Sequence, residues 1–147
     1  MTKAMESMSQ ENWKEDVVPH IAVLLPCFNE EAAVATVIAD FRAVLPQAKI
    51  YVYDNNSTDR TAEVARDAGA VVRHESRQGK GKVVRRMFSD VEADIYVLVD
   101  GDATYDAPSV LTMIRDLFEN HLDMVVGAGS QKTPVLIASV IAPEMLC

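Results

Sequence analysis

The sequence predicts an α/β fold in which a mainly parallel β-sheet carries helices on both faces. Short apolar runs alternate along the chain with segments whose apolar residues recur every three or four positions, and short connections join them. Strands that alternate with helices in this way are typical of parallel sheets. The 147 residues, 49% hydrophobic and 24% charged, suit one domain with a single core.

The first predicted strand and helix lie at the start of this pattern. Residues 21–27, IAVLLPC, form a continuous apolar run, which predicts a strand buried on both faces. Asn29 is the predicted cap of the next helix, because Glu30 and Glu31 would then lie at the positive end of the helix dipole. The apolar stripe of this helix stops before Pro46 and consists of Val34, Val37, Ile38, Phe41 and Leu45.

The alternation continues through the rest of the chain. Gly69 is expected to close the second helix, whereas Asp106 would cap the last one and Pro108 would lie in its first turn. The third helix is basic. Strands are predicted at 49–54, 70–74, 94–100 and 123–128, and helices at 57–69, 79–90 and 107–120.

Composition divides the chain into a polar arm at 1–18, the α/β region at 19–128 and an atypical apolar tail at 129–147. The arm lacks the apolar segment of a signal peptide, and no apolar stretch is long enough to span a membrane. Cys27 and Cys147 form neither a disulfide framework nor a metal-ligand spacing. We therefore expect a cytoplasmic protein.

The formal net charge of −8 argues against non-specific binding to nucleic acid or to an anionic membrane. Both kinds of binding depend on an excess of Lys and Arg. The net charge does not exclude anion binding at local basic clusters, because these act over short distances.

Polar residues follow each predicted strand. Because ligands bind at the carboxyl ends of parallel strands, the sequences NEE, DNNSTD, RQGKGK and DGDATYD would gather at one edge of the sheet. The sequence therefore predicts a ligand site at this edge.

Asp100 and Asp102 are the strongest candidates for metal ligands. Two carboxylates about 5 Å apart repel each other by roughly 3 kcal/mol at an effective dielectric constant near 20. Mg²⁺ or Mn²⁺ would remove that repulsion, and Gly101 between them lets the backbone turn tightly. The alternative is a solvated turn in which both carboxylates cap backbone amides.

Two further groups have both a functional and a structural interpretation. Asp54 could accept hydrogen bonds from a nucleobase, or the polar residues after it could simply build a turn and a helix cap. Arg77, Lys80 and Lys82, interleaved with glycines, could hold a pyrophosphate at a helix N-terminus or form a solvated basic helix. RQGKGKVV is not a P-loop, because no Ser or Thr follows the lysine.

Taken in order, the segments LLPCFNEE, VYDNNSTDRTAE, RQGKGKVVR and YVLVDGDATYDAP resemble the family 2 glycosyltransferases. These enzymes have the Rossmann-like GT-A nucleotide-binding fold. The similarity is greatest to the branch that moves a sugar from a nucleotide donor onto polyprenol (dolichol or undecaprenol) phosphate. It covers residues 21 to about 128, so we expect a truncated chain that holds only the amino-terminal, donor-binding half.

The resemblance implies a UDP- or GDP-sugar donor, a polyprenol phosphate acceptor, inversion at the anomeric carbon, and peripheral association with the inner face of the membrane. Asp54 would contact the base, Arg77 and Lys80 the base or phosphates, and Asp100 with Asp102 would hold the cation. The catalytic residues are not identified by the resemblance. The implied donor-binding residues are Pro26, Phe28, Asn29, Glu30, Asp54, Asn56, Arg77, Lys80, Asp100 and Gly101.

A second hypothesis is a catalytically inactive Rossmann-like module that acts by self-association. A half-domain would expose sheet edges and apolar patches that a longer chain would cover, which favours a homo-oligomer.

Overall fold

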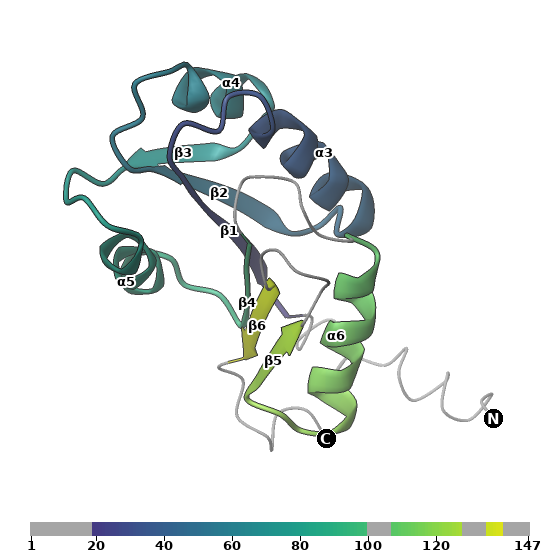
Figure 1. Ribbon diagram of the computed structural model, residues 1–147. Coiled ribbons are helices and arrows are strands. Elements are labelled where there is room, and N and C mark those ends of the chain that lie inside the picture. The colour runs from purple at the N-terminus through teal and green to yellow at the C-terminus, as the bar shows by residue number, and fades with distance from the viewer. Residues whose placement is uncertain (1–18, 100–106, 128–134, 140–147) are drawn as a thin grey trace.

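The structure, a computed structural model, describes residues 19–99, 107–127 and 135–139 (Figure 1). The predicted apolar runs form strands, and the predicted helical stripes form helices. The strands are β1 (Ile21–Cys27), β2 (Lys49–Asp54), β3 (Val71–His74), β4 (Ile95–Leu98), β5 (Met124–Gly127) and β6 (Val135–Ser139). The helices are α3 (Val34–Val44), α4 (Thr61–Asp67), α5 (Lys80–Asp90) and α6 (Ser109–Glu119).

One six-stranded sheet has the order β3-β2-β1-β4-β6-β5. The strands β1 to β4 are parallel, so the predicted mainly parallel sheet is confirmed. The strand β6 was not predicted, because its residues belonged to the apolar tail. It lies between β4 and β5 and is antiparallel to both, with Tyr96 opposite Ala138 and Val125 opposite Ile137.

Helices cover both faces of the sheet, as predicted (Figure 1). Residues of α3, α4 and α6 share the larger core with Val23 and Leu25 of β1. Val83 and Met87 of α5 share a smaller core with Leu24 of β1. Successive residues of a strand point to opposite faces, so the apolar run of β1 supplies both cores.

The predicted cap at Asn29 is wrong. The helix α3 begins at Val34 and follows a turn in which the Glu30 carbonyl accepts hydrogen bonds from the amides of Ala33 and Val34. Asn29 has a φ of 55°, in the left-handed region that asparagine tolerates. Its side chain accepts a hydrogen bond from the Thr58 amide, in the loop after β2. The predicted cap Asp106 lies outside the described residues.

Within the described ranges, every helix is too short or too polar to cross a bilayer.

Candidate functional site

The loops after β1, β2 and β3 meet at the carboxyl edge of the sheet. The Asn55 amide donates to the Cys27 carbonyl at 2.9 Å, and the Glu75 amide donates to the Asp54 carbonyl at 3.0 Å. Both bonds extend the parallel pairing beyond the ends of the strands. The predicted gathering of polar loops is therefore present for these three connections.

The β2–α4 loop holds the β1–α3 loop in place. Three consecutive amides, at residues 29–31, donate to side-chain oxygens of Ser57, Thr61 and Asp59 at 2.8, 2.8 and 3.2 Å. In return, Asn29 Oδ1 accepts a hydrogen bond from the Thr58 amide at 2.8 Å. The polar run after Asp54 thus supplies the partners of three loop amides that lie ahead of α3.

A pocket of about 370 Å³ opens between the β1–α3 loop and the start of α5. Four predicted donor-binding residues line it, namely Pro26, Phe28, Glu30 and Lys80. Phe28 is 48% exposed, so part of its side chain is available for a ligand. The remaining lining residues are Cys27, Asn55, Gln78, Gly79 and Val83.

Asp54 is buried at the end of β2 and is 7% exposed. Its Oδ1 atom is buried and has no hydrogen-bond partner among the residues that the structure describes. Its Oδ2 atom lies 3.8 Å from His74 Nδ1. Asp54 is not among the residues that line the pocket, although its neighbour Asn55 is. A buried carboxylate oxygen without a partner is costly in a protein and is suited to accepting a ligand hydrogen bond.

Asn55 is a site residue that the sequence analysis missed. It is 5% exposed, and its Nδ2 donates to the carbonyls of Glu75 and Arg77, both at 2.8 Å. Its Oδ1 accepts the Gly79 amide at 3.0 Å. These three bonds fix the loop between β3 and α5, which forms one wall of the pocket. The local sequence DNNST is equally typical of a solvated turn, so it does not show that Asn55 is buried.

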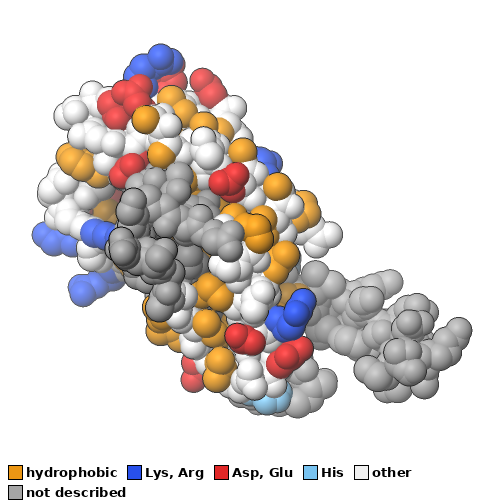
Figure 2. Space-filling view, turned by 45° about the vertical axis from the view of Figure 1, so that its right-hand side comes forward, with side chains coloured by type: hydrophobic (Ala, Val, Ile, Leu, Met, Phe, Trp, Pro, Cys, Tyr) orange, Lys and Arg blue, Asp and Glu red, His pale blue; other side chains and the backbone are white. Residues whose placement is uncertain are grey.

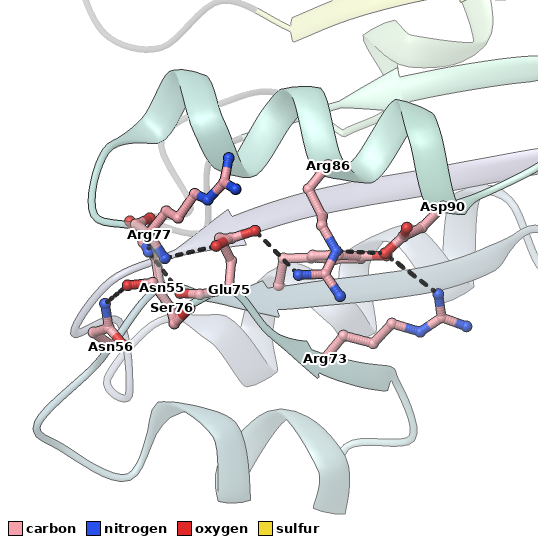
Figure 3. Close-up of polar contacts among 9 residues, drawn as sticks. Asn55, Asn56, Arg73, Glu75, Ser76, Arg77, Arg86 and Asp90 are labelled. Carbon is pink, nitrogen blue, oxygen red and sulfur yellow. Dashed lines mark hydrogen bonds and ion pairs between the residues drawn. The ribbon is translucent and has the colours of Figure 1, made fainter.

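Asn56 supports the same loop from an exposed position. Its Nδ2 donates to the Ser76 carbonyl at 2.9 Å (Figure 3). The same Nδ2 donates to Gln78 Oε1 at 2.9 Å, and the φ of Asn56 is 67°. Asn29, Asn56 and Arg77 were predicted to bind the donor, but they are not among the residues that line the pocket.

A network of charged groups continues from Arg77 along α5 (Figure 3). Glu75 is 4% exposed; its Oε2 accepts the Arg77 amide at 2.6 Å, and its Oε1 lies 3.2 Å from Arg86 Nη1. The Arg77 amide bond lowers the pKa of the Glu75 carboxyl, burial opposes this, and Arg86 lowers the pKa further. Glu75 is therefore charged at neutral pH.

Asp90 joins this network at the other end of α5. Its Oδ2 accepts hydrogen bonds from the Tyr53 hydroxyl and from Arg86 Nε, both at 3.0 Å, and lies 3.9 Å from Arg73 Nη1. The Tyr53 hydrogen bond lowers the pKa of Asp90, burial opposes this, and Arg86 lowers the pKa further. Burial raises the pKa of the Tyr53 phenol. Arg86 therefore bridges two carboxylates and is charge-compensated.

The predicted metal ligands Asp100 and Asp102, with Gly101 between them, lie outside the described residues. Within the described ranges, no group of three or more His, Cys, Asp or Glu side chains could hold a metal ion. Val99, the residue before Asp100, is 1% exposed, and its amide donates to the Leu24 carbonyl at 3.1 Å. Val99 therefore lies at the same carboxyl edge as the pocket.

Two curated proteins are similar to this chain in sequence. The chain is 60% identical to protein RfbJ of Shigella flexneri, over 78% of this chain and 92% of RfbJ. It is 33% identical to the dolichyl-phosphate hexose transferase of Haloferax volcanii, over 73% of this chain but only 46% of that protein.

Solved structures show the same fold. The glucosyl-3-phosphoglycerate synthase of Mycobacterium tuberculosis, in complex with Mn²⁺, UDP and phosphoglyceric acid, matches with a TM-score of 0.63 and 28% identity. The match covers 71% of this chain and 40% of the synthase. The same synthase has also been solved with Mg²⁺ and UDP. The predicted Rossmann-like GT-A fold is confirmed by these matches.

The family model described as "Glycosyl transferase family 2" matches residues 22–134, which include every described loop of the site. The resemblance that the four sequence segments indicated is thereby confirmed, and this chain belongs to glycosyl transferase family 2.

Proposed function

We propose that this chain binds a nucleotide-diphosphate sugar together with Mg²⁺ or Mn²⁺ at the carboxyl edge of the sheet. The observation that carries the proposal is the pocket of about 370 Å³ that Asn55 lines, directly after Asp54, whose buried Oδ1 has no hydrogen-bond partner among the described residues. Relatives solved with UDP and either cation support it, because they share the fold of this chain. Either UDP or GDP is a candidate leaving group.

The lining residues suit the parts of such a donor. The exposed ring of Phe28 offers a flat apolar surface to a base, and Asp54 offers a hydrogen-bond acceptor. Lys80 and the amides at the start of α5 offer positive charge to phosphate groups. Asn29, Asn56 and Arg77 would act by holding the loops around the donor rather than by lining the pocket.

Asp100 and Asp102 would hold the divalent cation. They follow Val99 in the sequence, and Val99 lies at the carboxyl edge of the sheet, which supports this assignment. The cation, when bound, would offset the charge of the diphosphate leaving group.

The proposed reaction is inverting transfer of the sugar to a polyprenol phosphate, in the cytoplasm at the inner face of the membrane. The similarity to the dolichyl-phosphate hexose transferase supports this acceptor. Its test is transfer of a labelled sugar to polyprenol phosphate, compared with transfer to water.

Calorimetric titration with UDP, GDP and their hexose conjugates, with and without Mn²⁺, tests donor binding. We expect binding that needs the cation and that weakens at least roughly tenfold in Asp54→Ala and in Asp102→Ala, since each loses one charge-assisted contact. Asp116→Ala, which removes an exposed carboxylate of α6, is the matched control and should bind as the original chain does. A folded protein that binds none of these ligands would contradict the proposal.

A second candidate function is self-association, without catalysis, through the edge strand β5. Met124 and Val126 lie on the same side of β5, and each is 55% exposed. Large apolar side chains on an edge strand favour pairing with another chain. Sedimentation velocity should then show dimers that Val126→Lys converts to monomers, whereas monomers of the original chain at high concentration would exclude this function.

A further inference from the structure

Positive charge is concentrated on one segment of this acidic chain. Residues 73–90 hold six of the 14 Lys and Arg residues but only two of the 22 acidic residues. This segment comprises the end of β3, the loop after it and all of α5. Figure 2 shows blue side chains gathered at the left edge, at the height that α5 has in Figure 1. The molecule is therefore polarised, with its positive side at α5.

A hollow of about 400 Å³ lies along this positive side, which we name the α5 groove. Lys82, Arg85, Arg86 and Ser89 line it from positions three and four apart, so they share one face of α5. The loop before α5 completes the groove with Glu75, Ser76 and Arg77.

The two carboxylates of this segment are already compensated. Glu75 accepts the Arg77 amide and contacts Arg86, and Asp90 contacts Arg86 and Arg73. By contrast, no ion pair joins Lys82 or Arg85 to another residue in the parts of the chain that the structure describes. Both side chains are exposed, so their charges are available to an external anion.

We propose that the α5 groove docks this chain onto an anionic membrane, with phospholipid phosphates facing Lys82 and Arg85. The inference rests on the proposed function, because a lipid-linked acceptor presents its phosphate at the membrane surface. A polarised molecule turns its positive side toward such a surface, even when its net charge is negative. Lipid phosphates complement the unpaired cations and the hydroxyls of Ser76 and Ser89.

Docking through the α5 groove also places the donor pocket near the lipid. Lys80, the first residue of α5, lines that pocket, and Lys82 lines the groove one half-turn later. The 11 residues of α5 span about 16 Å, so the donor would lie within one helix length of the headgroups. An acceptor phosphate could then reach the donor without leaving the membrane.

Co-sedimentation with vesicles tests this surface. One set of vesicles contains phosphatidylcholine alone, and the other contains phosphatidylcholine mixed with phosphatidylglycerol. We expect binding only to the anionic vesicles, with a marked decrease as salt is added. The double variant Lys82→Glu, Arg85→Glu should lower the partition coefficient about thirtyfold or more.

Arg66→Glu combined with Arg115→Glu is the matched control. It changes the net charge by the same amount as the α5 variant, but its substitutions lie on α4 and α6. It should bind vesicles far better than the α5 variant does. Equal loss in both variants would overturn the proposal, as would retained binding in the α5 variant or no binding by the original chain. Binding of inorganic phosphate in calorimetry without vesicle binding would likewise overturn it and indicate a soluble anion instead.

The same proteins titrated with UDP and Mn²⁺ separate this inference from the proposed function. Arg85→Glu alone should bind UDP as the original chain does, because Arg85 lines the α5 groove and does not line the donor pocket. UDP binding without vesicle binding would overturn only the docking surface. Vesicle binding that the α5 variant loses would support the docking surface, whatever the UDP titration gives.

Discussion

Replacing Asn55 by alanine should destabilise the chain by about 3 kcal/mol. The substitution removes three hydrogen bonds to the loop before α5, and the bond to the Glu75 carbonyl is fully buried. A buried carbonyl left without a partner costs about 1–3 kcal/mol, and each partly buried bond contributes about 0.5–1 kcal/mol. Because the same loop forms a wall of the pocket, affinity for UDP should fall roughly tenfold as well.

Urea unfolding followed by circular dichroism measures the first effect, and calorimetry measures the second. Asn56→Gly is the matched control, because it removes two exposed hydrogen bonds to the same loop while keeping the left-handed backbone accessible. Its cost should stay below about 1 kcal/mol. If Asn55→Ala has the same free energy of unfolding as the original chain, the idea that this side chain fixes the loop is refuted.

Three other predictions concern stability alone. The pKa values of Glu75 and Asp90 are lowered by folding from ordinary values of 4.5 and 3.8, so their stabilisation is complete above about pH 4.5 and is lost as the pH falls through the folded values. Acid unfolding should be less steep in Glu75→Gln, and an unchanged curve would exclude this carboxyl as a source. Gly69 has φ 99, a conformation that alanine adopts only under strain, so Gly69→Ala should cost about 1–3 kcal/mol. Gly81→Ala, in α5 with open space around it, should instead stabilise the fold by about 0.5–1 kcal/mol in thermal unfolding.

The strands and helices could be predicted because their patterns are local. The apolar run of β1 and the stripe from Val34 to Phe41 are visible in a few consecutive residues, and both occur where the sequence placed them. The sheet edge at which Pro26, Phe28 and Lys80 gather followed from the parallel arrangement of the strands. These inferences needed no knowledge of contacts between distant segments.

The remaining features depend on contacts between segments far apart in the sequence. Asn29 resembles a helix cap, but Ser57, Asp59 and Thr61 supply the partners of the loop amides from about 30 residues away. The role of Asn55 depends equally on the loop after β3. Local patterns identify a polar residue in a turn and cannot tell which backbone groups it will meet.

The position of β6 in the sheet has a consequence for the order of folding. Strands β1 to β4 can pair as soon as they are synthesised, but among the described strands β5 pairs with β6 alone, and β6 in turn pairs with β4. A nascent chain that ends at Gly127 therefore has a complete β5 segment with no strand to receive it. The pairing of Ile95 with Ser139 spans 44 positions, against 27 for Ala22 with Lys49 and 20 for Tyr51 with Val71, so loop-closure entropy delays this step relative to the pairing of β2 with β1 and β3. The amides of β5 and β6 should accordingly exchange with solvent as one cooperative unit, separate from the four parallel strands.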